Sequence, residues 1–191
     1  GVDGIKRAVD AVRKGEFACT VTSDPFWQGG MGLAIGYNAH MKKFDPATSN
    51  VTVIATIPVF TGNEQGLIGI AVDPNFANNH WIYLQYAPQD KSVFRLGRVV
   101  LVNDQLVEGS GKVVLEILVD RENTSHTGGG TAWDKDGNLF LTVGNNTGNG
   151  LLAQTDERPG RENFDDQRGA SNTNDLRGKI LRIHPEPDGT Y

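Results

Sequence analysis

Cysteine and long apolar runs are scarce in this chain of 191 residues. Cys19 is the only cysteine, which excludes a disulfide within the chain and a zinc site built from cysteines. The longest apolar stretch, Val51–Phe60, is interrupted by Thr and Pro and falls far short of the roughly 20 residues that cross a bilayer. We therefore expect no membrane insertion.

Positive charge is also scarce. The chain has 18 Lys and Arg against 23 Asp and Glu, a net charge of −5. No basic stripe interleaved with aromatic residues follows the sequence, so we expect no nucleic-acid partner. The apolar share of 38% is sufficient for a hydrophobic core. These features favour a globular protein that binds or converts something other than DNA or RNA.

The first 38 residues have the pattern of a helix followed by a strand. Apolar residues recur at helical spacing from Ile5 to Val12, and Gly15 ends the pattern, which predicts an amphipathic helix. A short buried strand is expected over Phe17–Thr22. We expect two units, a short α/β segment over 1–38 and a different domain over 41–191.

From about Met41 onward, short runs rich in Val, Ile, Thr and aromatics alternate with Asp-Pro and Asp-Gly turns, and the helical period is lost. The runs pair as strand, turn and strand: Gly69–Pro74 with Trp81–Tyr86, Val99–Val102 with Val113–Ile117, and Gly130–Asp134 with Leu139–Gly144. Hairpins repeated at long period are typical of a β-propeller. The sequence predicts a mainly β fold, a partial propeller of about two to three blades, whose open blade edges favour self-association.

A polar loop with one histidine precedes the last of these hairpins. His126 stands between Glu122 and Gly130 among Ser, Thr and Gly residues. A hairpin can hold such a side chain at its open end, and a neutral imidazole accepts a proton near neutral pH. The loop suits a proton-abstracting base, although a lone loop histidine is more often solvated than catalytic.

Two segments carry a family resemblance: Phe60–Phe76 (FTGNEQGLIGIAVDPNF) and Leu176–Pro185 (LRGKILRIHP). With them, the chain from about residue 41 onward resembles the PQQ-dependent soluble sugar (glucose/sorbosone) dehydrogenases. The resemblance implies a six-bladed propeller, the quinone PQQ in its axial cleft, and calcium bound to cofactor and protein. It further implies a small sugar as substrate, oxidised at its anomeric carbon by hydride transfer, and a periplasmic or secreted protein.

Matching the family motifs residue by residue places the general base on His126. The loop that borders the cofactor falls on Glu64 and Gln65, where a carboxylate at 64 would repel an anionic quinone. Where the family commonly has an acid that orients the base, this chain has Asn145. An amide can hold a tautomer but cannot stabilise the imidazolium that forms. The family's arginine and calcium ligands belong to later blades, so the metal ligands stay unknown and we expect this chain by itself to be inactive.

Residues 1–38 resemble something else, the C-terminal lobe of periplasmic sugar-binding proteins of the ribose-binding type. In that family an aspartate at the position of Asp3 accepts hydrogen bonds from sugar hydroxyls. The abrupt change from helical to strand pattern near His40-Met41 is also typical of an artificial fusion of two segments.

Other interpretations stay open beside the enzyme fragment. One is a non-catalytic propeller that binds carbohydrate or protein, favoured by Glu64 and Asn145. Another is an accidental fusion without a function of its own. The polar run over 154–168 could hold a metal, but its mixed charges favour a solvated loop held by its own ion pairs.

Overall fold

The computed structural model describes residues 38–45, 47–62, 64–122, 124–147, 156–161 and 165–191. The segment 1–37, with its predicted helix and strand and Asp3, lies outside the described residues. Within the described part the fold is mainly β, as the sequence predicts, and none of its helices is long and apolar enough to cross a membrane.

The strands of the described residues form three antiparallel sheets. The first is the hairpin of β1 (Asn38–Asp45) and β2 (Asn50–Pro58). The central sheet contains β3 (Leu67–Val72), β4 (Trp81–Tyr86), β5 (Val93–Val102), β6 (Gln105–Leu106) and β7 (Lys112–Leu118). The last sheet contains β8 (Gly128–Trp133), β9 (Leu139–Val143) and β10 (Lys179–Ile183).

The predicted hairpins are confirmed as β3 with β4 and β8 with β9. The third predicted pair is wrong in its register: Val113–Ile117 on β7 pairs with the first half of β5, from Phe94 to Gly97, whereas Leu101 and Val102 pair with the short β6. The turn after Val102 leads directly into β6, so β7 returns to the earlier half of β5. The helical turn α3 (Phe76–Asn79) was not predicted, and it ends at His80 in the left-handed region with φ 56°.

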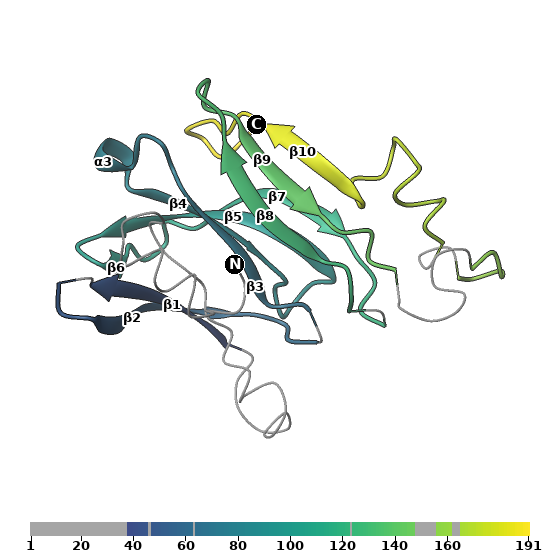
Figure 1. The fold of residues 1–191 in the computed structure, drawn as a ribbon, viewed down its shortest axis with the longest axis horizontal. Helices are drawn as coiled ribbons and strands as arrows, with labels where there is room; N and C mark the ends of the chain where they lie inside the picture. The colour runs from purple at the N-terminus through teal and green to yellow at the C-terminus, as the bar shows by residue number, and fades with distance from the viewer. Residues whose placement is uncertain (1–37, 46, 63, 123, 148–155, 162–164) are drawn as a thin grey trace.

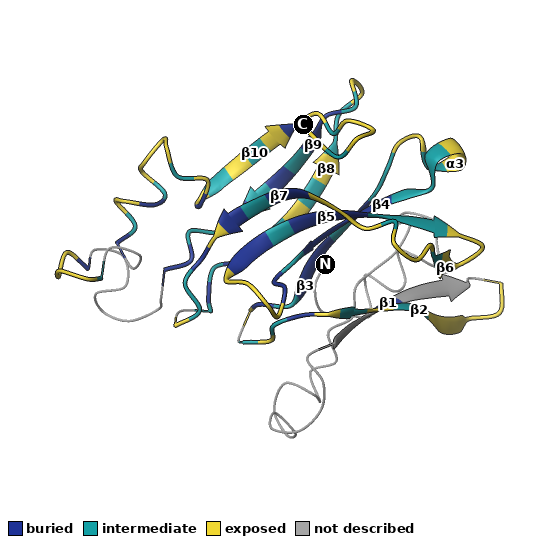
Figure 2. Ribbon diagram, turned by 180° about the vertical axis from the view of Figure 1, so that it is seen from behind, coloured by how far each residue is buried: buried dark blue, intermediate teal, exposed yellow. Residues whose placement is uncertain are grey.

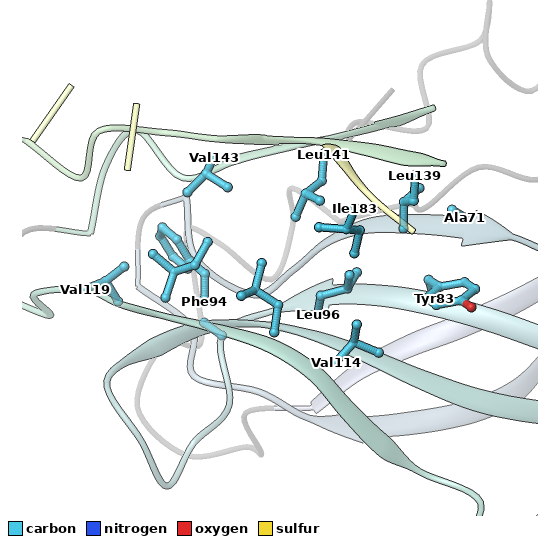
Figure 3. Close-up of a cluster of buried hydrophobic side chains, with 13 residues drawn as sticks. Ala71, Tyr83, Phe94, Leu96, Val114, Val119, Leu139, Leu141, Val143 and Ile183 are labelled. Carbon is cyan, nitrogen blue, oxygen red and sulfur yellow. The ribbon is translucent and has the colours of Figure 1, made fainter. Parts of the chain in front are cut away.

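The central sheet is apolar on both faces, because successive residues of a strand point to opposite sides. On β4, Ile82 and Leu84 face the first sheet, while Tyr83 faces the last sheet. Trp81 packs against the same core as Tyr83, and the ring of Tyr83 meets that of Trp133 on β8 edge to face, with ring centroids 5.3 Å apart. The larger of the two cores fills the space between the central and last sheets (Figure 3).

The sheets therefore follow one another as layers, with β1 and β2 at one end and β8 to β10 at the other (Figure 1). Burial is concentrated on the central sheet (Figure 2). The end layers leave large apolar side chains exposed, with Val51 at 60% on β2 and Ile180 at 72% on β10. Such faces are what an incomplete propeller leaves open. Self-association through them stays a prediction.

The first strands of the central and last sheets, β3 and β8, lie side by side at the level of two glycines. A Cβ on Gly69 would lie 2.5 Å from the carbonyl oxygen of Gly129, and a Cβ on Gly129 would lie 2.4 Å from that of Ile68. Hydrogen bonds also join the sheets, since Thr131 Oγ1 donates to Ile70 O at 3.2 Å. Neighbouring sheets that meet through their first strands are the arrangement of propeller blades.

Truncation of Leu141 tests the packing between these sheets. Leu141 is 1% exposed in the larger core, so Leu141→Ala leaves a cavity and should lower the free energy of unfolding by about 2–5 kcal/mol. Ile180→Ala on β10 is the control and should change it by less than about 0.5 kcal/mol, because Ile180 is exposed. Urea denaturation followed by circular dichroism measures both, and equal losses would contradict this packing.

Candidate functional site

The candidate site lies at one end of the hairpin formed by β8 and β9. Gly128, the first residue of β8, pairs with Val143, the last of β9, so the chain enters β8 where it leaves β9. Beyond this pair the two connections remain joined, since Gly144 N donates to Thr127 O at 3.1 Å and Asn146 N donates to His126 O at 3.2 Å. This places His126 and Asn145, which are far apart in the sequence, on facing segments.

Gly144 has no room for a side chain. A Cβ there would lie 1.6 Å from the His126 carbonyl oxygen and 2.8 Å from Thr127 N. Both obstacles are backbone atoms, which cannot rotate away as a side chain can. The His126 loop therefore lies directly on the strand exit, and the absence of a Cβ at 144 is what lets it approach.

The His126 loop also contacts the turn that carries Glu64. His126 has φ 55°, in the left-handed region that non-glycine residues rarely adopt, and its N–H donates to Glu64 Oε2 at 2.6 Å. Thr127 Oγ1 donates to Glu64 O at 3.2 Å, and Glu64 N donates to Thr124 O at 3.3 Å. The Glu64 carboxylate thus has a structural partner, and the sequence contained no signal for this contact.

The imidazole of His126 is half-buried and held through one ring nitrogen. Its Nδ1 lies 3.0 Å from Asn145 Oδ1 and 3.5 Å from Thr147 Oγ1. Asn145 Nδ2 in turn donates to Asp166 Oδ1 at 2.9 Å. Within the described part of the chain, Nε2 of His126 makes no hydrogen bond. The structure thus brings together His126 and Asn145, as the motifs suggest, and adds Asp166, which sequence reasoning missed.

Gln65, next to Glu64, is a buried amide without partners. Its side chain is 6% exposed, and neither Oε1 nor Nε2 has a hydrogen bond within the described part of the chain. A buried amide that lacks hydrogen bonds costs free energy, so such a group commonly marks a place where water or a ligand binds. The amide of Gln65 therefore has a donor and an acceptor that no other described residue uses.

Asp156 and Asp165, in the polar run after β9, pair with arginines. Asp156 Oδ2 lies 2.5 Å from Arg158 Nη2 and 3.5 Å from Arg161 Nε, and Asp165 Oδ2 lies 3.3 Å from Arg168 Nε. In the described residues of this run the predicted ion pairs are confirmed, but both carboxylates are buried, at 4% exposure each, and not solvated as predicted. The described residues contain no group of three or more His, Cys, Asp or Glu side chains that could hold a metal ion.

Two other buried groups have no place in proton transfer. Burial raises the pKa of Tyr83 to about 12, so its hydroxyl stays protonated near neutral pH. Arg98, 3% exposed, donates to the carbonyl oxygens of Glu186 and Pro187 at 2.7 Å and lies over the ring of Trp81. It secures the C-terminal segment to the central sheet.

The stacked antiparallel sheets place the chain among the β-propeller proteins, with a histidine loop at the end of one hairpin. The sequence model of the glucose / sorbosone dehydrogenase family matches residues 29–191. The chain belongs to this family, as its resemblance in sequence predicts.

Solved structures similar to this chain share its fold. One is the PQQ-bound aldose sugar dehydrogenase of Streptomyces coelicolor, with a TM-score of 0.55 and 24% identity over 81% of this chain and 40% of that chain. Another is a putative oxidoreductase (glucose dehydrogenase) of Thermus thermophilus, with a TM-score of 0.59 and 22% identity over 81% of this chain and 41% of that chain. The chain therefore spans about two fifths of the length of these structures.

An uncharacterized protein of Synechocystis sp. is 27% identical over 152 residues, which are 76% of this chain and 34% of that protein. The family match begins at residue 29, ahead of the expected boundary at His40-Met41. That boundary, the ribose-binding resemblance of 1–38 and the role of Asp3 stay predictions.

A side chain at position 144 tests the contact between the two connections. Gly144→Ala should lower the free energy of unfolding by at least about 1–3 kcal/mol, because the Cβ overlaps the His126 carbonyl oxygen. Gly111→Ala is the control, since nothing lies within 4 Å of a Cβ there, and we expect a change below about 0.5 kcal/mol. Denaturant titration compares them, and an unchanged midpoint for Gly144→Ala would show that the loop does not lie on Gly144.

The pairing of Asp156 predicts a pH dependence of the polar run. Hydrogen bonds from the Arg158 guanidinium hold the pKa of Asp156 well below its unfolded value of about 3.9. The stabilisation is therefore complete above that unfolded value and is lost as the pH falls through the lower folded-state pKa. The exchange rates of the Arg158 and Arg161 amides, corrected for intrinsic rates, should stay low down to about pH 4 and should rise below it. Asp156→Asn should raise these exchange rates at neutral pH. Faster exchange already near pH 5 in the unmodified chain would contradict the pairing of Asp156 with Arg158.

Proposed function

We propose that this chain is the part of a PQQ-dependent sugar dehydrogenase that carries the proton-abstracting base, His126. The observation that supports this most is the 3.0 Å contact between His126 Nδ1 and Asn145 Oδ1, together with an Nε2 that has no partner among the described residues. An imidazole held by one nitrogen and open at the other is the arrangement that a general base requires.

The chemistry follows from the tautomer. Asn145 presents an oxygen to Nδ1, and an oxygen of an amide can only accept, so Nδ1 carries the proton of the neutral ring. Nε2 then carries the lone pair. It can take the hydroxyl proton of an alcohol bound beside it, and the resulting imidazolium remains hydrogen-bonded to Asn145 through Nδ1.

The residues beside His126 fit a quinone cofactor in one respect. The buried amide of Gln65 has no partner among the described residues, so it offers a donor and an acceptor to a polar group bound next to it. The Glu64 carboxylate already accepts a hydrogen bond from the His126 backbone. PQQ, when bound, supplies a quinone that accepts the hydride of the anomeric carbon. Gln65 and the Glu64 turn would border it, while His126 removes the proton.

The other parts of this proposal concern the whole protein. Since the chain spans about two fifths of its structural relatives, a complete axial site needs further blades, and the chain alone should not turn over sugar. We place the calcium ligands outside the described residues. The substrate class is an aldose, and the compartment is the periplasm or the outside of the cell.

A second candidate is a propeller of the same family that binds carbohydrate or protein without catalysis. The neutral amide of Asn145 favours it, because an amide stabilises an imidazolium less than a carboxylate does. The two candidates differ in whether His126 accelerates a reaction.

Replacement of His126 separates them. The longer protein that contains this chain, loaded with PQQ and calcium, should oxidise an aldose with a dye as electron acceptor. His126→Gln should lower kcat by about 10²- to 10⁴-fold while the absorbance of bound quinone persists, because only proton abstraction is lost. His184→Gln is the control, since His184 is exposed and contacts Asn138 instead. Turnover that is unaffected by His126→Gln, or absent in the loaded protein, would refute the proposal.

A further inference from the structure

We propose that Asp166 is a positioning residue for His126, acting through the side chain of Asn145. Asp166 accepts from Asn145 Nδ2 at 2.9 Å, and Asn145 Oδ1 faces His126 Nδ1 at 3.0 Å. The three side chains form a chain of hydrogen bonds that starts at a carboxylate and ends at the imidazole. Its relevance to catalysis rests on the proposed function of His126, whereas its existence does not.

The carboxylate decides which way the amide of Asn145 points. An ionised carboxylate only accepts hydrogen bonds, so it selects the NH₂ end of the amide and turns the oxygen toward His126. A weaker contact agrees with this orientation, since Thr147 N donates to Asn145 Oδ1 at 3.3 Å. If the amide were reversed, an N–H would face Nδ1, which would favour the tautomer with the lone pair on Nδ1. That tautomer leaves Nε2 protonated and unable to act as a base.

The described segment that carries Asp166 is held by turn hydrogen bonds and by Lys179. A turn forms after Asp165, where Arg168 N donates to Asp165 O at 3.0 Å, and Ser171 N donates to Asp166 O at 3.3 Å. Lys179, the first residue of β10, donates from Nζ to the carbonyl oxygens of Ala170 at 2.7 Å and Gly169 at 3.2 Å. These contacts anchor the connection to the last sheet, so the carboxylate stays at a fixed place beside Asn145.

Gly178 allows this segment to reach Asn145. Its N–H donates to Gly144 O at 3.0 Å, and its φ of 65° is in the region that favours glycine. A Cβ at 178 would lie 2.6 Å from Ala170 Cβ and 3.5 Å from Asn145 Cβ. The Asp166 segment, the exit from β9 and the start of β10 thus pack together where the amide of Asn145 is held.

Asp166 also supplies the charge that Asn145 lacks. The amide is neutral, but a carboxylate bonded to its far end polarises it and places a negative charge one side chain away from the imidazole. Two residues, Asn145 and Asp166, therefore share the task that a single carboxylate at position 145 would perform: Asn145 sets the tautomer and Asp166 supplies the negative charge.

The ¹⁵N chemical shifts of the His126 ring test the proposal, because they distinguish a protonated from an unprotonated ring nitrogen. In the 191-residue chain at alkaline pH, where the ring is neutral, we expect Nδ1 to carry the proton. Asp166→Ala should give a mixture in which a substantial share of the rings carry the proton on Nε2. Asp166→Asn should lie between the two, because its amide oxygen can still accept from Asn145.

Two comparisons separate positioning from a general structural effect. Asp136→Ala removes the same charge from the exposed turn between β8 and β9 and should leave the tautomer unchanged. In an Asn145→Ala background, Asp166→Ala should have no further effect on the His126 tautomer, since the connecting amide is gone. Amide spectra of the central sheet verify that each variant is folded.

Three results would overturn the proposal: a proton on Nε2 in the unmodified chain, an unchanged tautomer in Asp166→Ala, or an equal effect of Asp166→Ala in the Asn145→Ala background. These ¹⁵N measurements need neither cofactor nor sugar. A protein that shows the expected tautomers but no sugar oxidation would refute the proposed function and leave the role of Asp166 intact.

Discussion

The carbonyl of His126 lies against the backbone of Gly144, and the geometry of the site depends on this contact. Two connections that are separated by the whole β8–β9 hairpin are brought within hydrogen-bonding distance, so an imidazole from one can meet an amide from the other. Because Gly144 has no Cβ, the His126 loop can lie on the exit of β9. In this position His126 has a left-handed backbone and donates its N–H to the Glu64 carboxylate. Sheet pairing alone would bring the ends near each other without fixing their side chains.

The sheets provide the rigid support for that contact. The central sheet is buried on both faces, and β8 is aligned against β3 where glycines allow the backbones to touch. Because β3 follows the turn of Glu64 and β8 follows the loop of His126, the same strand contact that joins two sheets also brings these two segments together. The apolar faces at the two ends of the stack fit a chain that spans about two fifths of its structural relatives.

Much of the fold could be predicted from local pattern. Alternating apolar residues and Asp-Gly or Asp-Pro turns identify β3, β4, β8 and β9, because strand periodicity and turn chemistry act over a few residues. The facing of His126 and Asn145 was available from the motif. The contact of Asp166 was not, since it depends on where a long connection returns to the sheet, and mixed charges there suggested only ion pairs. The hydrogen bond from the His126 N–H to the Glu64 carboxylate could not be predicted either, because it accompanies the positive φ of His126, which the sequence does not indicate.

Asp166 belongs to an irregular connection and not to a strand. Strands tolerate insertions poorly because their register fixes every side chain, whereas connections between strands accept changes of length and composition. Changes of sequence around Asp166 would therefore alter its hydrogen bond to Asn145, and through it the orientation of the amide that faces His126, while the sheets stay the same. Relatives with the same strands would then differ at this site in a loop that a comparison of the strands alone would not detect.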